Sequence, residues 1–163
     1  MITLIQRVRA AAVLVDGETV GAIEHGLLLF VGVEQGDQEA DAAETARKVA
    51  ALRCFPARTP MDLSVRDAGG AILSVSQFTL TAELRHGNRP DFTAAEAPTR
   101  AADLWQRVGD LLRAAGLTVA TGRFGASMQV QICNDGPVTF VLTVRGGKVV
   151  ARTGPDAAPS APS

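Results

Sequence analysis

The chain has 163 residues, of which 47% are hydrophobic and 20% are charged, a composition typical of an ordered globular protein with one domain. The formal net charge of −1 argues against broad electrostatic binding of nucleic acid, which usually needs a basic excess, so any such contact must be local. We expect a single domain over residues 1–152 and a disordered tail over residues 153–163, where there is little to bury.

The first third of the chain predicts β-strands. Asp16-Gly17 suits a tight hairpin, because both positions tolerate positive φ. The run from Leu27 to Val31 predicts a buried strand after this hairpin. The hydrophobic residues that alternate on either side of the hairpin are Val13, Val15, Val20 and Ile23.

The composition then shifts to helix formers. We expect a helix with Asp37 as its N-cap that ends near Cys54, before two prolines. The segment from Ala71 to Leu80 is apolar and β-branched, which predicts a central strand that ends near Thr81.

Pro98 to Gly116 predicts a second helix, since proline is favoured in the first turn and glycine just after the last one. Strands are expected at 117–120, 129–133 and 138–144, the last leading into a hairpin loop at Gly146-Gly147. The pattern predicts a mixed α/β fold with curved, largely antiparallel, barrel-like β-sheets covered by two main helices. The apolar stripe of the second helix consists of Leu104, Trp105, Val108, Leu111 and Leu112.

Cysteine spacing and hydropathy narrow the class of protein further. Cys54 and Cys133 have no metal-ligand or redox spacing, so we expect reduced thiols, no metal site and no cofactor. The longest apolar run, from Leu27 to Val33, is too short to span a bilayer, and no signal peptide is predicted. A cytoplasmic protein without a membrane partner is expected.

Two polar segments do not fit these patterns well. Ser76-Gln77-Phe78-Thr79-Leu80 crowds hydrogen-bonding side chains at the end of an apolar strand, although an edge strand would explain them equally well. In Asn134-Asp135-Gly136-Pro137-Val138-Thr139, the first three residues favour a turn. Pro137 then removes a backbone donor where the next strand should begin to pair, and a trans turn proline is the simpler interpretation.

In this order and spacing, the two segments resemble the signature motifs of the D-aminoacyl-tRNA deacylase family. The chain departs from the family pattern at Thr59-Pro60-Met61-Asp62, which replaces a Gly-Lys-Met-Asn stretch, and at Trp105, where a tyrosine is frequent. The tetrapeptide Ser76-Gln77-Phe78-Thr79 favours the D-specific branch over a related family. Further similar stretches are Gln6-Arg7-Val8, Gly26 to Val33, Gly87-Asn88-Arg89-Pro90, and Thr121 to Ala126 with Met128.

The resemblance implies a homodimeric hydrolase that contacts the 3′ end of tRNA and removes D-amino acids from it, with no DNA partner. It assigns the catalytic segment to Ser76, Gln77, Phe78 and Thr79. It also implies that Gly136-Pro137 is cis and reaches into the partner's pocket, where its carbonyl groups would exclude L-amino acids. Glycine has no side chain to exclude, so glycyl-tRNA mischarged on tRNA-Ala is a further expected substrate.

Three other residues gain roles from the resemblance. Arg7 matches an arginine that holds the Gly-Pro carbonyl groups, which suits its planar set of donors. Asn134 begins the second motif and is expected in substrate binding. Met128 is expected beside the adenosine, although a core methionine would explain it as well.

A separate cluster of polar residues, Arg85, His86 and Arg89, is expected to contact tRNA phosphate.

The chain lacks G-x-S-x-G, H-E-x-x-H and P-loop motifs, and its two histidines, His25 and His86, lie in glycine-flanked turns that predict surface positions. Thr79 has no adjacent base to activate it. These absences suit the mechanism that the resemblance implies, in which a hydroxyl of the terminal ribose assists hydrolysis and backbone N–H groups near Gln77 and Phe78 stabilise the oxyanion. The alternatives are a non-catalytic tRNA-binding module of the same fold and a metal-dependent peptidase, for which no ligand cluster is visible.

Overall fold

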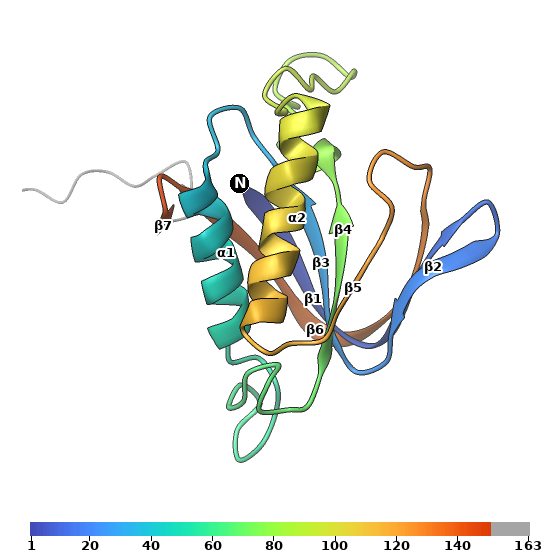
Figure 1. Cartoon of the computed structure of the whole chain (residues 1–163), viewed down its shortest axis with the longest axis vertical. Coiled ribbons are helices and arrows are strands. Elements are labelled where there is room, and N and C mark those ends of the chain that lie inside the picture. Colours follow the sequence, from blue (N-terminus) through green and yellow to red (C-terminus); the bar gives the residue numbers. More distant parts are fainter. Residues whose placement is uncertain (151–163) are drawn as a thin grey trace, which may run out of the picture.

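The computed structural model describes residues 1–150 and shows a strongly curved β-sheet with two helices packed side by side against it (Figure 1). The expected mixed α/β fold is confirmed, whereas the tail predicted over residues 153–163 lies outside the described residues. No helix in residues 1–150 is long and apolar enough to cross a membrane. The elements are β1 (Ile2–Val15), β2 (Glu18–Ile23), β3 (Gly26–Gly32), α1 (Glu39–Ala51), β4 (Ala71–Ser76), the 3-10 helix η1 (Phe78–Thr81), α2 (Pro98–Ala114), β5 (Val119–Thr121), β6 (Gln129–Arg145) and β7 (Lys148–Val149).

The seven strands follow the order β5-β4-β3-β1-β6-β7, with β2 paired to the second half of β1. Only the β3–β4 and β4–β5 pairs are parallel, in agreement with a largely antiparallel prediction. The predicted hairpin at Asp16-Gly17 is confirmed, with φ values of 52° and 83° at its two residues. The predicted loop at Gly146-Gly147 joins β6 to β7.

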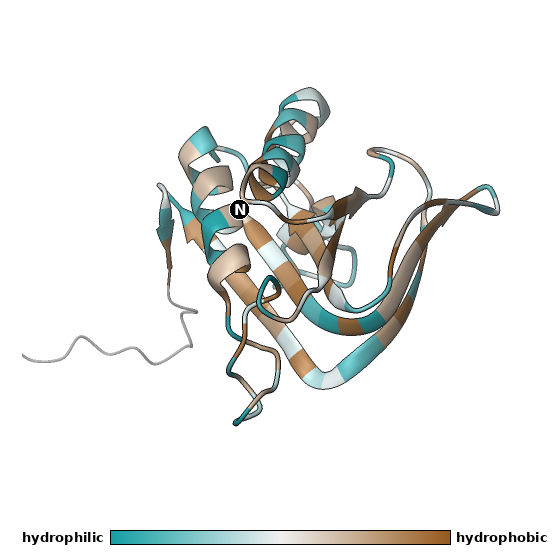
Figure 2. Cartoon of the chain, turned by 60° about the horizontal axis from the view of Figure 1, so that its bottom comes forward, coloured by the Kyte–Doolittle hydropathy of each residue, from teal (hydrophilic) through white to brown (hydrophobic). Residues whose placement is uncertain are grey.

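Two hydrophobic clusters hold the sheet in its curved form. The larger one contains residues of the sheet and of both helices, and the smaller one contains residues of the strands alone, such as Val8 and Val13 of β1 and Leu73 of β4. Hydrophobic and hydrophilic residues alternate along the long strands (Figure 2), as expected for strands with one buried face.

The second helix confirms its prediction closely. Pro98 occupies the first turn, and Gly116, with φ of 82°, follows the last turn. Leu104, Trp105 and Val108 are among its buried residues. The strand that follows spans Val119–Thr121 and so begins two residues later than expected.

The first helix starts and ends differently from its prediction. Gln38, not Asp37, is the N-cap, and Asp41 completes a capping box by accepting from the Gln38 N–H at 2.8 Å. Asp37 instead accepts from the buried α-amino group of Met1 at 2.6 Å. A buried ammonium group without a partner would cost more free energy than a helix without this side-chain cap. The helix ends at Ala51, before the expected Cys54.

The strand predicted from Ala71 to Leu80 ends at Ser76, and the chain turns into η1. Gln77 makes the last bond to β3, donating to the Val31 carbonyl at 2.8 Å, and the Thr81 hydroxyl closes the turn on the Phe78 carbonyl at 2.7 Å. The turn passes closely over Gly32, where an added Cβ would lie 3.0 Å from the Gln77 carbonyl oxygen. A continuous strand was therefore the wrong prediction, and the turn exposes Phe78 and Thr79.

The two strands predicted at 129–133 and 138–144 form one long strand, β6. Asn134 to Pro137 is therefore not a hairpin turn, because both halves of β6 pair with β1 and only the register shifts near Val8. The Gly136-Pro137 peptide bond is cis, as expected.

Candidate active site

A hollow of about 670 Å³ opens where the end of β4, η1, the start of α2 and the loop after β5 meet. Its walls are mostly apolar, with a few polar groups from the segment that follows β4. Such a hollow suits an organic ligand that is held by apolar contact and oriented by a few polar groups. The wall residues are Val31, Val33, Val75, Ser76, Gln77, Phe78, Phe92, Ala95, Glu96, Ala97, Pro98, Ala101, Trp105, Phe124, Gly125, Ala126, Met128 and Val130.

The first motif lies at this hollow because β4 ends at Ser76 and the chain then turns into η1. Ser76, Gln77 and Phe78 line the wall, and the ring of Phe78 is 58% exposed. Thr79 is outside the wall, but its hydroxyl accepts a hydrogen bond from the Gln77 side-chain amide. That contact fixes the orientation of Gln77 and brings no base to Thr79.

The start of η1 leaves backbone donors open. The first N–H groups of a helix have no acceptor within it, and no acceptor within residues 1–150 is present for the N–H groups of Phe78 and Thr79. The Gln77 N–H, by contrast, is bound to the Val31 carbonyl. Open donors beside an apolar hollow can stabilise negative charge that develops on a bound carbonyl oxygen. Of the two residues near which such donors were expected, Gln77 has its N–H bound within the sheet and Phe78 has its N–H open.

Aromatic side chains from distant parts of the chain complete the hollow. Phe78 and Phe92 meet edge to face with ring centroids 5.1 Å apart, and Trp105 lies 5.9 Å from Phe124. The Trp105 indole N–H donates to the Ser74 hydroxyl at 3.0 Å, which fixes the ring. From the sequence, Trp105 belongs to the apolar stripe of the second helix and replaces a frequent tyrosine, and neither observation predicts its place in this wall. The sequence did contain a signal, because a buried indole N–H needs a partner and Ser74 lies in an apolar strand.

Met128 lies in the wall of the hollow. The resemblance predicts that it contacts the adenosine of the substrate, and a core methionine is the alternative. It packs against Gly122, since a Cβ at that glycine would lie 2.7 Å from the Met128 sulfur. A side chain at position 122 would therefore require Met128 to move. The loop then presents Phe124, Gly125 and Ala126 to the hollow.

The second motif lies elsewhere, on β6 where it crosses β1. Gly136 and Pro137 are exposed, and neither they nor Arg7 and Asn134 line the hollow. The Asn134 amide donates to the Arg7 carbonyl at 2.8 Å, which ties the motif to β1. The structure therefore separates the expected site residues into two groups.

Arg7 is 8% exposed and contacts the start of this motif. One of its terminal nitrogens donates to the Cys54 carbonyl at 2.6 Å, and Nε lies 2.8 Å from the Asp135 carboxylate. In the single chain it thus contacts the residue before Gly136-Pro137. Burial raises the pKa of the Cys54 thiol to about 11, although the nearby Arg7 charge acts in the opposite direction.

The two histidines occupy the surface positions expected for them. His25 and His86 are exposed, and neither lines the hollow. The ring of His25 packs edge to face on Phe55 with centroids 5.0 Å apart.

Known proteins resemble this chain over nearly its whole described length. The family model described as D-Tyr-tRNA(Tyr) deacylase matches residues 4–143. A protein named D-aminoacyl-tRNA deacylase from Syntrophotalea carbinolica is 54% identical over 143 residues, which cover 87% of this chain and 96% of that protein. A protein of the same name from Geobacter metallireducens is 52% identical and covers 87% of this chain and 95% of its own length.

Two solved structures share the fold of this chain. One titled "c-Myc DNA Unwinding Element Binding Protein" has a TM-score of 0.84 at 37% identity and covers 89% of this chain and 99% of its own. Another, titled "Structural Analysis of a probable eukaryotic D-amino acid tRNA deacylase", has a TM-score of 0.72 at 17% identity over 86% and 97% of the two chains, a likeness of fold alone. The match to residues 4–143 and the identities of 52% and 54% show that this chain belongs to the D-Tyr-tRNA(Tyr) deacylase family.

Proposed function

We propose that this protein hydrolyses the ester bond between a D-amino acid and the 3′ end of tRNA, releasing both. The observation that carries the proposal is the open N–H donor of Phe78, a wall residue of the apolar hollow that the first family motif lines, with the open Thr79 N–H next to it in the chain. These donors suit the oxyanion of an ester under attack. Because aminoacyl-tRNA serves cytoplasmic translation, we infer that the enzyme acts in the cytoplasm.

The reaction as we propose it needs no nucleophile from the protein. Thr79 carries a hydroxyl in this segment, but its hydrogen-bond partner, Gln77, supplies a donor and not a base. The ester on the terminal ribose has a free 2′-hydroxyl beside it. The protein then contributes the position of the ester and the stabilisation of its oxyanion, and the substrate contributes the assisting group.

Chiral selection in this proposal comes from a second copy of the chain. Gly136 and Pro137 are exposed and lie outside the hollow of their own chain. The same strand exposes Ile132 by 42% and Val141 by 52%, an apolar surface that a partner would cover. In the homodimer, carbonyl groups of Gly136-Pro137 would crowd the chiral carbon in the partner's hollow. An L side chain would clash there, whereas D-aminoacyl-tRNA and glycyl-tRNA mischarged on tRNA-Ala would fit.

Deacylation of matched D-Tyr-tRNA and L-Tyr-tRNA tests the activity directly. We expect rapid release of D-tyrosine and little release of L-tyrosine. Single-turnover conditions matter, because a module of the same fold that binds tRNA without hydrolysing it would bind both substrates and release neither. That result would replace the proposed enzyme with a binding protein.

A subunit-mixing experiment tests the shared site. A Cβ added at Gly136 meets only the Asn134 side chain, at an ordinary 3.4 Å, so Gly136→Ala should fold normally and intrude only into a partner's hollow. Ala126→Trp should block the hollow itself. Each variant alone should be impaired, and a mixed dimer of the two should recover activity, because one site then combines an intact hollow with an intact Gly136. Absence of recovery in verified mixed dimers would show that each chain builds its own site.

A further inference from the structure

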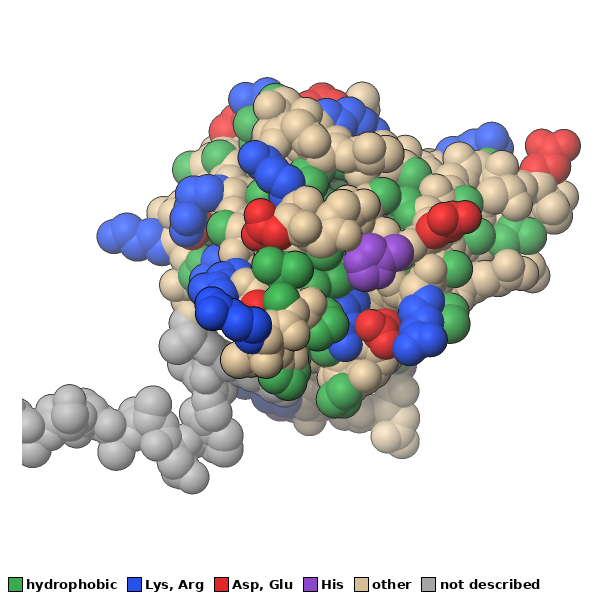
Figure 3. Space-filling model, turned by 90° about the horizontal axis from the view of Figure 1, so that it is seen from below, with side chains coloured by type: hydrophobic (Ala, Val, Ile, Leu, Met, Phe, Trp, Pro, Cys, Tyr) green, Lys and Arg blue, Asp and Glu red, His purple; other side chains and the backbone are tan. Residues whose placement is uncertain are grey.

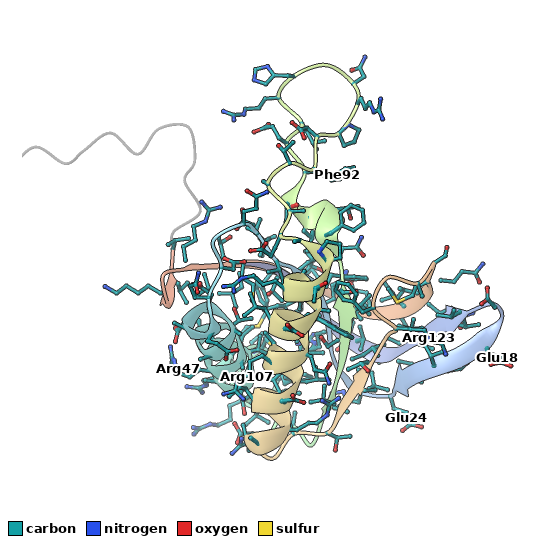
Figure 4. The ribbon with its side chains drawn as sticks, turned by 45° about the horizontal axis from the view of Figure 1, so that its top comes forward. Glu18, Glu24, Arg47, Phe92, Arg107 and Arg123 are labelled. Carbon is teal, nitrogen blue, oxygen red and sulfur yellow. The ribbon has the colours of Figure 1, made fainter. Side chains whose placement is uncertain are left out.

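The segment 83–91 stands out from the body of the protein at the edge of the hollow (Figure 1). Residues 84–94 are all exposed. The segment leaves the body at Phe92 (Figure 4), whose ring forms the hollow wall together with Phe78. A ligand that is longer than the hollow and leaves it on the side of Phe92 would pass this segment.

The charges of this segment are unequally neutralised. Arg85 and Glu83 form a close ion pair at 2.6 Å, and the hydrogen bond from Arg85 lowers the pKa of Glu83 to about 2. Asp91 accepts from the Thr93 N–H at 2.8 Å. Arg89, in contrast, has neither an ion pair nor a side-chain hydrogen bond among the contacts of residues 1–150. Its exposed guanidinium is free to bind an anion.

A second unneutralised arginine lies on another side of the hollow. Arg123 is exposed and directly precedes the wall residues Phe124 to Ala126. Its backbone position is fixed, because the Ala126 N–H donates to the Arg123 carbonyl at 3.2 Å and Gly122 packs on Met128. Figure 4 shows Arg123 toward the β1–β2 hairpin, away from Phe92. No ion pair of Arg123 occurs within the described part of the chain.

Most other arginines of the described residues are paired with acidic side chains, as Arg47, Arg107 and Arg113 illustrate. With a formal charge of −1, the protein has no general attraction for a polyanion. Arginines that stay unpaired beside the hollow are therefore the cations best placed to bind one. An RNA strand provides phosphates at regular intervals, so its 3′ end can enter the hollow while the strand remains within reach of both side chains.

We propose that Arg89 and Arg123 bind backbone phosphates of the substrate RNA on two sides of the hollow, and so hold the strand while its aminoacylated end enters. The inference rests on the proposed function for the identity of the ligand as tRNA. It adds an interaction surface outside the hollow. Both arginines are binding residues here and take no part in the chemistry.

Binding of uncharged tRNA, followed by fluorescence anisotropy over a range of salt concentrations, tests the inference separately from catalysis. Arg89→Gln and Arg123→Gln should each weaken binding by about 3- to 10-fold at low salt and reduce the slope of log K against log salt by about 0.7–0.9. In the double variant, the two losses of binding free energy and the two changes in salt slope should add, because the two residues share no contact. In deacylation assays, each variant should lose more kcat/KM on D-Tyr-tRNA than on D-tyrosyl-adenosine.

Arg58→Gln is the matched control. Arg58 is also exposed and has no ion pair among the described residues, but it belongs to the loop 52–70 at the opposite end of the molecule. Seen from below (Figure 3), that end also carries Lys and Arg side chains, interspersed with Asp and Glu. We expect wild-type affinity and salt slope for this variant.

The possible outcomes separate the two proposals. Unchanged salt slopes in both variants, or an equal loss in Arg58→Gln, would overturn the phosphate contacts even if the enzyme deacylates D-Tyr-tRNA. Absence of turnover with specific, arginine-dependent tRNA binding would instead overturn the proposed activity and leave the RNA surface standing. If the wild-type protein binds no tRNA at all, the inference is wrong.

Discussion

Two neighbouring hollows show how differently this fold treats polar groups. A second hollow of about 400 Å³ lies next to the candidate site, and only a strip of paired backbone separates them. In that strip Glu34 and Ala95 form an antiparallel β-bridge through their backbones, and the Glu96 N–H donates to the Val33 carbonyl at 3.0 Å. The walls of the second hollow are Glu34, Gln35, Gly36, Asp37, Asp41, Ala94, Arg145 and Gly146.

The charged groups of the second hollow are bound by the protein itself. Asp37 binds the Met1 amino group and also accepts from the Glu34 N–H at 2.7 Å. Asp41 accepts from the N–H groups of Gln38 and Gly147, each at 2.8 Å, and Arg145 pairs with Glu34 at 2.8 Å. The candidate site has apolar walls and keeps backbone donors open. The comparison teaches that polarity alone does not mark a site, whereas polar groups left without partners do.

The largest expected effect concerns the candidate site, where our proposal assigns the assisting group to the substrate and not to the protein. Replacing the terminal ribose of D-Tyr-tRNA by its 2′-deoxy form should lower the single-turnover rate by about 100-fold or more, because the assisting hydroxyl is lost. Affinity for the modified tRNA, measured in parallel, should stay close to normal. A deoxy substrate that turns over at the normal rate would show that the protein itself supplies the assisting group.

The next largest effect concerns the second hollow, which should matter for stability and not for turnover. Asp37→Asn weakens a buried ion pair, although the Met1 amino group retains contacts with Glu34 and the Val144 carbonyl. We expect a loss of about 2–3 kcal/mol in the free energy of unfolding, measured by urea denaturation, with kcat/KM within about twofold of wild type. The exposed residue Asp103 offers the control Asp103→Asn, which should change neither quantity. A large fall in kcat/KM with full stability would contradict the division into a structural and a functional hollow.

A smaller effect is expected at Thr79, which orients Gln77 and carries no catalytic charge. Thr79→Ala removes one hydrogen bond, worth about 0.5–1.5 kcal/mol, so the deacylation rate should fall by about tenfold at most. A fall of several orders of magnitude with folding and tRNA binding preserved would identify Thr79 as the nucleophile.

The smallest effect is a pH dependence in the second hollow. Desolvation raises the pKa of Asp37 above its ordinary value of 3.8, although the Met1 amino group and the Glu34 N–H lower it. A raised pKa in the folded state means that this group contributes stability below its unfolded pKa and loses it as the pH rises through its folded pKa. The stability advantage of wild type over Asp37→Asn should therefore be larger near about pH 4 than near about pH 7. Denaturation of both proteins at the two pH values measures it, and an advantage that grows with pH would contradict the raised pKa.

The sequence by itself determined the features that depend on a few adjacent residues. The hairpin at Asp16-Gly17 and the helix bounded by Pro98 and Gly116 follow from backbone preferences, which do not need distant contacts. The two motifs indicated the family for a similar reason, since their residue types and order are visible without a fold. Asp16 also shows how strong this local preference is, because it adopts positive φ without being glycine.

Only the tertiary structure decided the features that depend on what distant residues bring together. Asp37 binds the buried Met1 amino group and does not cap the helix, and the strand after Ala71 ends where the chain turns at Gln77 and passes closely over Gly32. Trp105 and Phe124 became walls of one hollow only through the packing of α2 against the sheet. The physical reason is that the free energy of burying a charge or a ring depends on its three-dimensional neighbours, which the local sequence does not specify.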